Sequence, residues 1–239
     1  LAGVMTHFTD AGRDTASTAH EHDAFLSLMD RVGRLPRDCK LHVAATAATV
    51  RSTDYHHDLV RIGLGWAGWV PGDPAASRRL GLKPAVSWTS RVIHIHQLSA
   101  GDRVGYGGLW TAPRDTCIGL VPVGYADGLP PTAGATAGRP GARVHVVAPN
   151  GWQAEAPIVG AVSMDQIAID LGPAGRSQGE DLTVTLIGAS DDAGASLPEF
   201  ASASGVSPHQ LLVGIGHRVR RAYRDRPVDQ PISAFAEAV

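Results

Sequence analysis

The sequence predicts an α/β region followed by an antiparallel β domain. Residues 1–86 alternate short apolar runs with helical stretches, which is typical of βα units that build a parallel sheet. From about residue 86 the pattern changes to short strand-like runs separated by turn signals such as Asp127-Gly128 and Asn150-Gly151. We therefore expect two domains, residues 1–86 and residues 87–239.

Composition excludes several classes of protein. The chain has 239 residues, of which 44% are hydrophobic and 18% charged, so it is globular rather than disordered. A net charge of −2 provides no strong basic field, so we expect neither a nucleic-acid partner nor a membrane partner. No apolar run approaches a membrane span of about 18 residues, and no signal peptide is visible, which predicts a cytoplasmic protein with reduced Cys39 and Cys117.

The first region reads as part of a larger sheet. Strands are predicted at 1–8, 41–44 and 60–64, and a helix at 18–35. The helix carries an apolar stripe made of Phe25, Leu28, Met29, Val32 and Leu35. A closed (β/α)8 barrel needs about 200–250 residues. These residues therefore hold only three or four βα units, and the first residue, Leu1, starts directly in a strand-like run, which suggests that the chain is cut from a longer one.

The second region predicts an antiparallel sheet and two short helices. The strand-like runs are 86–97, 116–124, 143–148, 157–163, 166–171 and 182–187. Between them, residues 128–142 are small and rich in Gly and Pro, which predicts a mobile surface loop. Helices are predicted at 196–203 and 207–216, the second with Ser207 as N-cap and Pro208 in the first turn.

Four kinds of residue are candidates for a catalytic or binding role. His7 and His42 follow predicted strands, where a histidine is either structural or catalytic. Arg61 lies in an apolar run, and a buried guanidinium needs a ligand, a carboxylate or other hydrogen-bond partners. Gly63 suits either an anion site or close packing. Tyr125 lies in a turn, where a tyrosine often has no role.

Three pairs of histidines could suggest a metal site. They are His20 and His22, His56 and His57, and His94 and His96. None has a third ligand of matching type nearby in the sequence, so we interpret them as solvated side chains and expect no metal site.

Two long segments together resemble one enzyme family. The segments VPVGYADG (121–128) and PIVGAVSMDQ (157–166) are similar to those of the alanine racemases, fold-type III enzymes that use pyridoxal 5'-phosphate (PLP). GDRVGYG (101–107) and GHRVRRAY (216–223) are similar to family segments too. The resemblance covers only the later part of the family. It implies an α/β plus β architecture: the C-terminal part of a (β/α)8 TIM-type barrel, followed by the β domain of the family.

The resemblance also implies catalytic roles. Tyr125 matches the catalytic tyrosine, one of two bases that flank the substrate Cα, and acts at the cofactor of the other subunit. Arg61 matches the arginine that faces the pyridine nitrogen of PLP, and His42 and His7 match histidines that link the arginine to the tyrosine. Such a network brings a phenol with an ordinary pKa near 10 into range as a base.

Cofactor and substrate contacts follow in the same way. Thr46 matches a residue that binds the PLP phosphate, to which Gly63 and Leu64 would donate backbone N–H groups. Met164 matches a residue whose backbone lies beside the substrate carboxylate, and Asp165 is next to it.

The chain departs from the family pattern at several places. Ala45 replaces a frequent asparagine, His217 an aromatic residue and Arg220 a proline, and residues 65–70 (GWAGWV) differ from the family's aliphatic–tyrosine–glycine run. The family's arginine that helps to bind the substrate carboxylate has no counterpart here. The largest departure is the lysine that binds PLP in the family. The chain has only Lys40 and Lys83, and neither lies in the family's A-V-x-K-A-x-x-Y-G-H-G segment. We therefore expect the isolated chain to be inactive.

The resemblance implies that the whole protein interconverts L- and D-alanine, supplies D-alanine for peptidoglycan, and forms a homodimer with shared active sites. Two alternatives remain. One is a racemase of the same family for serine or a broader set of amino acids, because pocket size decides substrate preference. The other is a non-catalytic binding or dimerisation module that kept the β domain and lost the lysine. An upstream segment containing the lysine would favour an enzyme.

Overall fold

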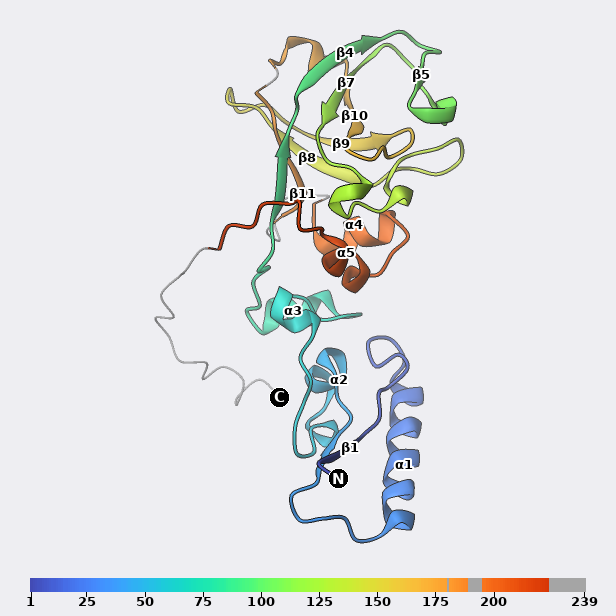
Figure 1. The fold of residues 1–239 in the computed structure, drawn as a ribbon, viewed down its shortest axis with the longest axis vertical. Coiled ribbons are helices and arrows are strands. Elements are labelled where there is room, and N and C mark those ends of the chain that lie inside the picture. The colour runs from blue at the N-terminus through green and yellow to red at the C-terminus, as the bar shows by residue number, and fades with distance from the viewer. Residues whose placement is uncertain (180, 189–194, 224–239) are drawn as a thin grey trace. The chain divides into compact units, whose positions relative to one another are not determined.

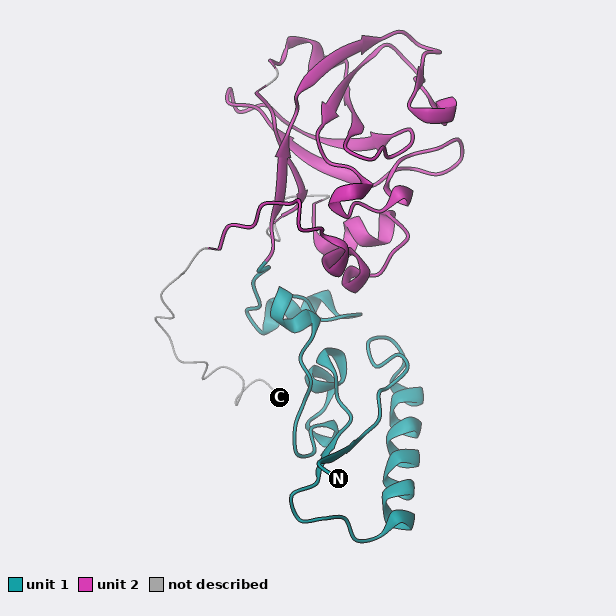
Figure 2. Ribbon diagram, in the orientation of Figure 1, with its two compact units in different colours: residues 1–85, 225–239 teal, residues 86–224 magenta. Residues whose placement is uncertain are grey.

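The computed structural model describes residues 1–179, 181–188 and 195–223 (Figure 1). These residues form two compact units that divide between Ala85 and Val86 (Figure 2). The end of the predicted second domain, residues 224–239, lies outside the described residues.

The first unit contains a two-stranded parallel sheet. β1 (Gly3–Met5) pairs with β2 (Lys40–His42), with Gly3 opposite Lys40 and Met5 opposite His42. Parallel neighbours need a crossover, and the helix α1 (Thr15–Val32) supplies it (Figure 1). Two short helices follow, α2 (Thr46–Arg51) and α3 (Pro74–Arg79). This is the predicted βα arrangement, with shorter strands.

The helix α1 begins and ends three residues earlier than predicted. Asp14 caps it, because its side chain accepts a hydrogen bond from Ser17 N–H at 2.9 Å, and Gly33 ends it with a φ of 75°. Phe25 is buried in a core cluster whose other buried members are Phe8, Val43, Ala44, Ala48 and Tyr55. Leu28 and Val32 of the predicted stripe are exposed, since the described part of this unit offers too small a core to cover them.

The predicted strand at 60–64 is wrong. Arg61 N–H does donate to Ala44 O at 3.0 Å, as a neighbour of β2 would. The ladder then stops, because the next residues turn back towards Thr46 and enter a 3-10 helix, Leu64–Ala67. Too few backbone hydrogen bonds therefore form in succession to make a strand.

The second unit is built on a seven-stranded antiparallel sheet with the order β3-β11-β8-β9-β10-β7-β4. Its strands are β3 (Trp88–Arg91), β4 (His94–Leu98), β7 (Thr116–Val121), β8 (Arg143–Val147), β9 (Gln153–Val159), β10 (Ile167–Gly172) and β11 (Thr183–Ile187). β5 (Arg103–Val104) and β6 (Trp110–Thr111) form a separate pair. The predicted antiparallel β domain is confirmed.

The single run predicted at 86–97 forms two strands that lie at opposite ends of this order. Val92 N–H donates to Leu182 O at 2.9 Å, whereas Ile93 N–H donates to Leu120 O at 2.8 Å. The chain thus changes partner strand between two adjacent residues. The sheet has to curl so that its two ends meet along this run (Figure 1).

Residues 128–142 are not the predicted surface loop. Leu129, Ala133 and Ala142 are buried. A Cβ at Gly141 would overlap the carbonyl oxygen of Ile158, so the backbone itself lies against β9. The small side chains that suggested a loop are what allow this close packing. The two helices predicted nearby in the C-terminal part are present as α4 (Leu197–Ala203) and α5 (Pro208–Gly214).

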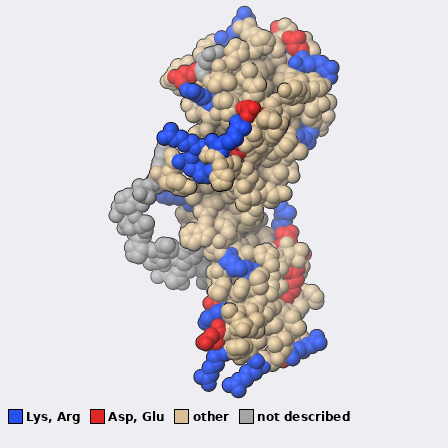
Figure 3. All heavy atoms as spheres, viewed as in Figure 1, with Lys and Arg blue, Asp and Glu red and all other residues tan. Residues whose placement is uncertain are grey.

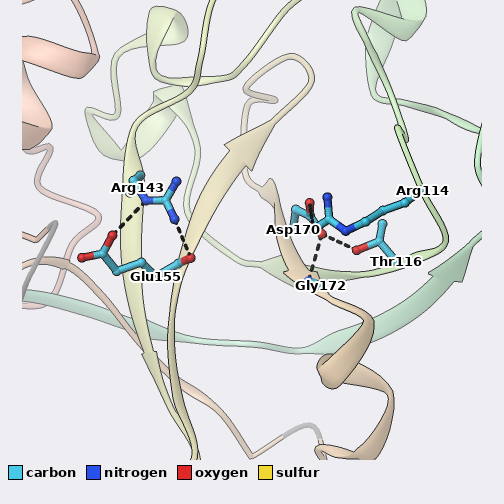
Figure 4. A network of polar contacts seen from close by, with 6 residues as sticks. All are labelled: Arg114, Thr116, Arg143, Glu155, Asp170 and Gly172. Carbon is cyan, nitrogen blue, oxygen red and sulfur yellow. Dashed lines mark hydrogen bonds and ion pairs between the residues drawn. The ribbon is translucent and has the colours of Figure 1, made fainter.

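A buried carboxylate fixes the end of β10. Asp170 accepts hydrogen bonds from Gly172 N–H at 2.9 Å and from the Thr116 hydroxyl, and lies 3.4 Å from Arg114 Nη2 (Figure 4). These partners satisfy the charge at the point where the pairing with β7 is irregular. The role of this network is structural.

On the face drawn in Figure 3, Lys and Arg side chains gather in one group on the second unit, whereas charged side chains of both signs are scattered elsewhere. Among the described residues, no helix is long and apolar enough to cross a membrane.

Candidate functional site

Arg61 is the centre of a hydrogen-bond cluster in the first unit. Its Nη1 donates to His42 Nδ1 at 2.8 Å and to His42 O at 3.1 Å. Its Nη2 lies 3.0 Å from Thr6 O, 3.1 Å from Val43 O and 3.1 Å from His7 Nδ1. Residues at the ends of β1 and β2 therefore hold the guanidinium. Its described partners are imidazole nitrogens and backbone carbonyls, not the carboxylate that the sequence analysis considered.

The partners of Arg61 fix the form of both histidines. An arginine has no acceptor, so His42 and His7 accept through Nδ1 and carry their protons on Nε2. Within the described residues, no carboxylate contacts the guanidinium, and its Nε makes no hydrogen bond. As neutral rings, both histidines thus keep an N–H on Nε2, and the Arg61 Nε–H has no acceptor among the described residues.

Thr46 organises a second cluster beside the first. Its buried Oγ1 accepts from Gly63 N–H at 3.0 Å and from Gly65 N–H at 3.3 Å. Gly65 was missed by the sequence analysis, which named only Gly63 and the buried Leu64; a second glycine two residues on was the available signal. Ala45 leaves the start of α2 without a side-chain cap, as the loss of an asparagine there implies.

Tyr125 lies in the second unit, on a turn that is docked to another loop. Tyr125 N–H donates to Ser163 O at 3.0 Å, and Ala126 N–H donates to Met164 O at 3.0 Å. The side chains of Tyr125 and Met164 are 45% and 53% exposed, so the backbone rather than packing places them. Gly124 is required here, because a Cβ would overlap the carbonyl oxygens of Ser163 and Met164.

Two charged residues that the sequence analysis did not place in the site complete this region. Asp127 is buried, and its Oδ2 accepts from Gly124 N–H at 2.9 Å. Its Oδ1 lies 3.4 Å from Arg218 Nε, while Arg218 Nη2 lies 2.6 Å from Asp165 Oδ1. The hydrogen bond to Asp165 and the charge of Asp127 raise the pKa of Arg218. The Gly124-x-x-Asp127 spacing, typical of a capped turn, was the available signal for Asp127.

The structure thus brings the predicted residues together in two groups. The first unit holds His7, His42, Arg61, Thr46, Gly63 and Leu64, and the second unit holds Tyr125 and Met164. Two of the histidine pairs meet in the first unit, a contact that was not predicted: His22 Nε2 lies 2.9 Å from His57 Nε2. No group of three or more possible metal ligands occurs in the part of the chain that the structure describes.

Fold and site together define a two-domain α/β plus β protein with a fixed arginine at the ends of parallel strands. Two family models match it: "Alanine racemase, N-terminal domain" over residues 1–71 and "Alanine racemase, C-terminal domain" over residues 85–223. The chain belongs to the alanine racemase family. The predicted resemblance and fold class are therefore confirmed.

Individual relatives agree with the family models. The alanine racemase of Vibrio atlanticus is 35% identical over 228 residues, which cover 92% of this chain and 56% of that protein. The crystal structure of biosynthetic alanine racemase from Pseudomonas aeruginosa matches with a TM-score of 0.78 and 33% identity, over 93% of this chain and 57% of that one. The alanine racemase from Bacillus anthracis, solved with bound L-Ala-P, matches with a TM-score of 0.67 and 31% identity, over 91% and 53%. The chain thus spans about half the length of the relatives it matches.

Proposed function

We propose that this chain is part of a PLP-dependent enzyme that interconverts L- and D-alanine. One observation carries the proposal. In this member of the alanine racemase family, two imidazoles and three backbone carbonyls accept hydrogen bonds from the Arg61 guanidinium. These contacts leave the Nε–H without an acceptor among the described residues, as a contact with the ring nitrogen requires.

The described residues fit the cofactor. Arg61 would hold the pyridine nitrogen, and Thr46 with the N–H groups of Gly63 and Leu64 would hold the phosphate. The Gly63 N–H, which donates to Thr46 Oγ1 in this structure, would exchange that acceptor for a phosphate oxygen. When bound, PLP supplies an electron sink for the negative charge left at the substrate Cα. An arginine, unlike an acid, offers the ring nitrogen no proton, which limits delocalisation and favours racemisation over side reactions.

The residues of the chain then move the proton at Cα. The hydroxyl of Tyr125 is one of two bases, taking the α-proton from one face of the substrate or returning it there. His7 and His42 carry protons on Nε2, and their N–H groups connect the tyrosine hydroxyl to Arg61. This lowers the cost of the phenolate that a tyrosine base must form. The backbone of Met164 lies beside the substrate carboxylate, and Tyr125 also lines the substrate.

The proposal extends to the whole protein. A homodimer would share its active sites, because Tyr125 serves the cofactor of the other subunit. The product D-alanine would feed peptidoglycan synthesis, and the enzyme would be cytoplasmic.

Joining the chain to the N-terminal portion of a family member tests the proposal. With PLP, the chimera should racemise alanine in both directions, and a matched chimera carrying Arg61→Gln should lose PLP-dependent activity. A folded, PLP-loaded chimera that leaves both alanine enantiomers unchanged would contradict the proposal, and turnover of serine in place of alanine would favour the alternative racemase.

A further inference from the structure

We propose that Arg218 is a positioning residue for Tyr125, which it keeps in place by joining the tyrosine turn (residues 124–128) to the substrate loop (residues 163–165). The proposal rests on the base role proposed for Tyr125. No motif of the sequence analysis assigned this role to Arg218.

Backbone contacts dock the tyrosine turn on the substrate loop. Two backbone hydrogen bonds, from Tyr125 to Ser163 and from Ala126 to Met164, dock it. The side chains of Tyr125 and Met164 are both exposed and contribute little packing. The orientation of the hydroxyl therefore depends on how firmly the turn backbone is held.

Arg218 bridges the two segments through their carboxylates. Its Nε lies 3.4 Å from Asp127 Oδ1 in the turn, and its Nη2 lies 2.6 Å from Asp165 Oδ1 in the loop. Without the guanidinium, two like charges would face each other across the joint and push it open. The planar fork of an arginine reaches both carboxylates at once, which the single ammonium of a lysine does less well.

The segment that carries Arg218 is itself anchored to the turn. Gly216 N–H donates to Asp127 O at 2.8 Å. Arg221 closes the segment on itself, with Nη2 2.9 Å from Ile215 O and Nη1 3.2 Å from Gly216 O. Gly128 packs so tightly against Gly214 that a Cβ would overlap its carbonyl oxygen. Arg218 is thus presented from a backbone already fixed to one of the two segments that it joins.

The 239-residue chain itself allows a direct test with a matched control. Arg218→Gln removes the bridge, whereas Arg143→Gln removes an ion pair of similar exposure on β8 and β9, where Arg143 Nε lies 3.0 Å from Glu155 Oε2 (Figure 4). Amide hydrogen exchange at Tyr125 and Ala126 should be faster in Arg218→Gln by about 2- to 30-fold, the range expected for two ion pairs made by one half-exposed guanidinium. Arg143→Gln should leave it unchanged.

A spectroscopic readout separates positioning from general stability. The chain has four tyrosines, so fluorotyrosine labelling gives few resonances, and Tyr125→Phe identifies the one that matters. Arg218→Gln should shift or broaden that 19F resonance, and Arg218→Lys should restore it in part. In the chimera, Arg218→Gln should lower kcat while the KM for alanine changes little.

Unchanged exchange and an unchanged 19F resonance in Arg218→Gln would overturn the proposal, whether or not the chimera is active. If Arg218→Gln does not fold, Asp165→Asn removes the exposed half of the bridge and must loosen the same two amides. An inactive chimera with intact Arg218 would count against the proposed function alone, because the exchange and resonance measurements need neither cofactor nor turnover.

Discussion

The phenol of Tyr125 is 45% exposed, so its replacement by phenylalanine should leave the fold of the second unit intact. In the chimera, Tyr125→Phe should lower kcat by about 10²- to 10⁴-fold in both directions, the usual contribution of a general acid–base group. We expect the tyrosine to serve L-alanine, so loss of the α-proton to solvent should slow far more from L- than from D-alanine. Proton exchange measured by NMR in D₂O checks this.

Mixed dimers provide the control for that variant. Subunits with Tyr125→Phe, mixed with subunits that lack the PLP-binding lysine, should recover one working site per dimer. Near-full activity of Tyr125→Phe alone would contradict the role of the tyrosine, and so would mixed dimers without activity when both parents fold and dimerise.

His57 makes the stability of the first unit depend on pH. It is the one described residue other than glycine with a positive φ, at 47°, and its Nε2 faces His22 Nε2 at 2.9 Å. Burial lowers the pKa of His57 from its ordinary value of 6.5, the charge of His22 lowers it further, and Asp58 acts in the opposite direction. A single proton on either of the two facing Nε2 atoms forms a hydrogen bond between the rings, whereas a proton on each would place two donors against each other.

The sign of the pH effect follows from this lowered pKa. Above the ordinary value of 6.5 both folded and unfolded chains hold His57 neutral, and its contribution to stability is complete. As the pH falls below that value, the unfolded chain binds the proton first, so the free energy of unfolding of the first unit decreases. Urea unfolding at pH 7.5 and 5.5 should show this loss, and His57→Gln should reduce it.

His209→Gln, at an exposed position on α5 in the other unit, is the control. An equal loss of stability in His57→Gln and in the unmodified chain would contradict the assignment to His57.

Among the elements, the tyrosine turn depends most on a single glycine. Gly124→Ala places a methyl group where the carbonyl oxygens of Ser163 and Met164 lie, so the turn has to move away from the substrate loop. We expect a loss of about 1–3 kcal/mol in the free energy of unfolding of the second unit, the usual cost of overpacking. Denaturant unfolding followed by tryptophan fluorescence measures it.

Gly179→Ala is a matched control, since nothing lies within 4 Å of the Cβ that it would add. Gly124→Ala should also speed amide exchange at Tyr125 and Ala126. If both alanine variants are equally stable, backbone contact at Gly124 does not hold the turn.

At the scale of the whole molecule, the two units differ in how much of their apolar surface is buried. In its described part, the first unit has two strands of three residues each, and it exposes apolar side chains such as Trp66, at 79%, and Leu28. The second has a curled seven-stranded sheet with fully buried side chains such as Ile158 and Leu186. Amide hydrogen exchange should therefore be faster over residues 1–85 than over the sheet strands. Equal protection of both units would contradict this.

The lysine content of the chain gives a second prediction at this scale. Lys40 and Lys83 are exposed and lie outside the family's lysine segment. The 239-residue chain should therefore form no stable covalent adduct with PLP and should not racemise alanine. Borohydride treatment after dialysis, followed by mass spectrometry of peptides, checks this. A trapped adduct on either lysine would show that the expectation is wrong.

The sequence by itself determined the two-part architecture, the family and the candidate residues. The spacing of apolar residues distinguishes βα units from antiparallel strands, because helices and strands each have their own periodicity of side-chain direction. Tyr125 lies in one of the two long segments that resemble the family, and Arg61 stands out because it is a charged residue in a short apolar run.

Only the tertiary structure decided which backbone groups meet. The run at 86–97 became two strands at opposite ends of a sheet, and residues 128–142 became buried, because partners distant in sequence supply their hydrogen bonds and packing. The same holds for the site. Thr46 meets Gly65, and Arg218 meets Asp127 and Asp165, through contacts that no local pattern encodes. Local sequence sets the conformations a segment favours, whereas long-range contacts decide which of them forms.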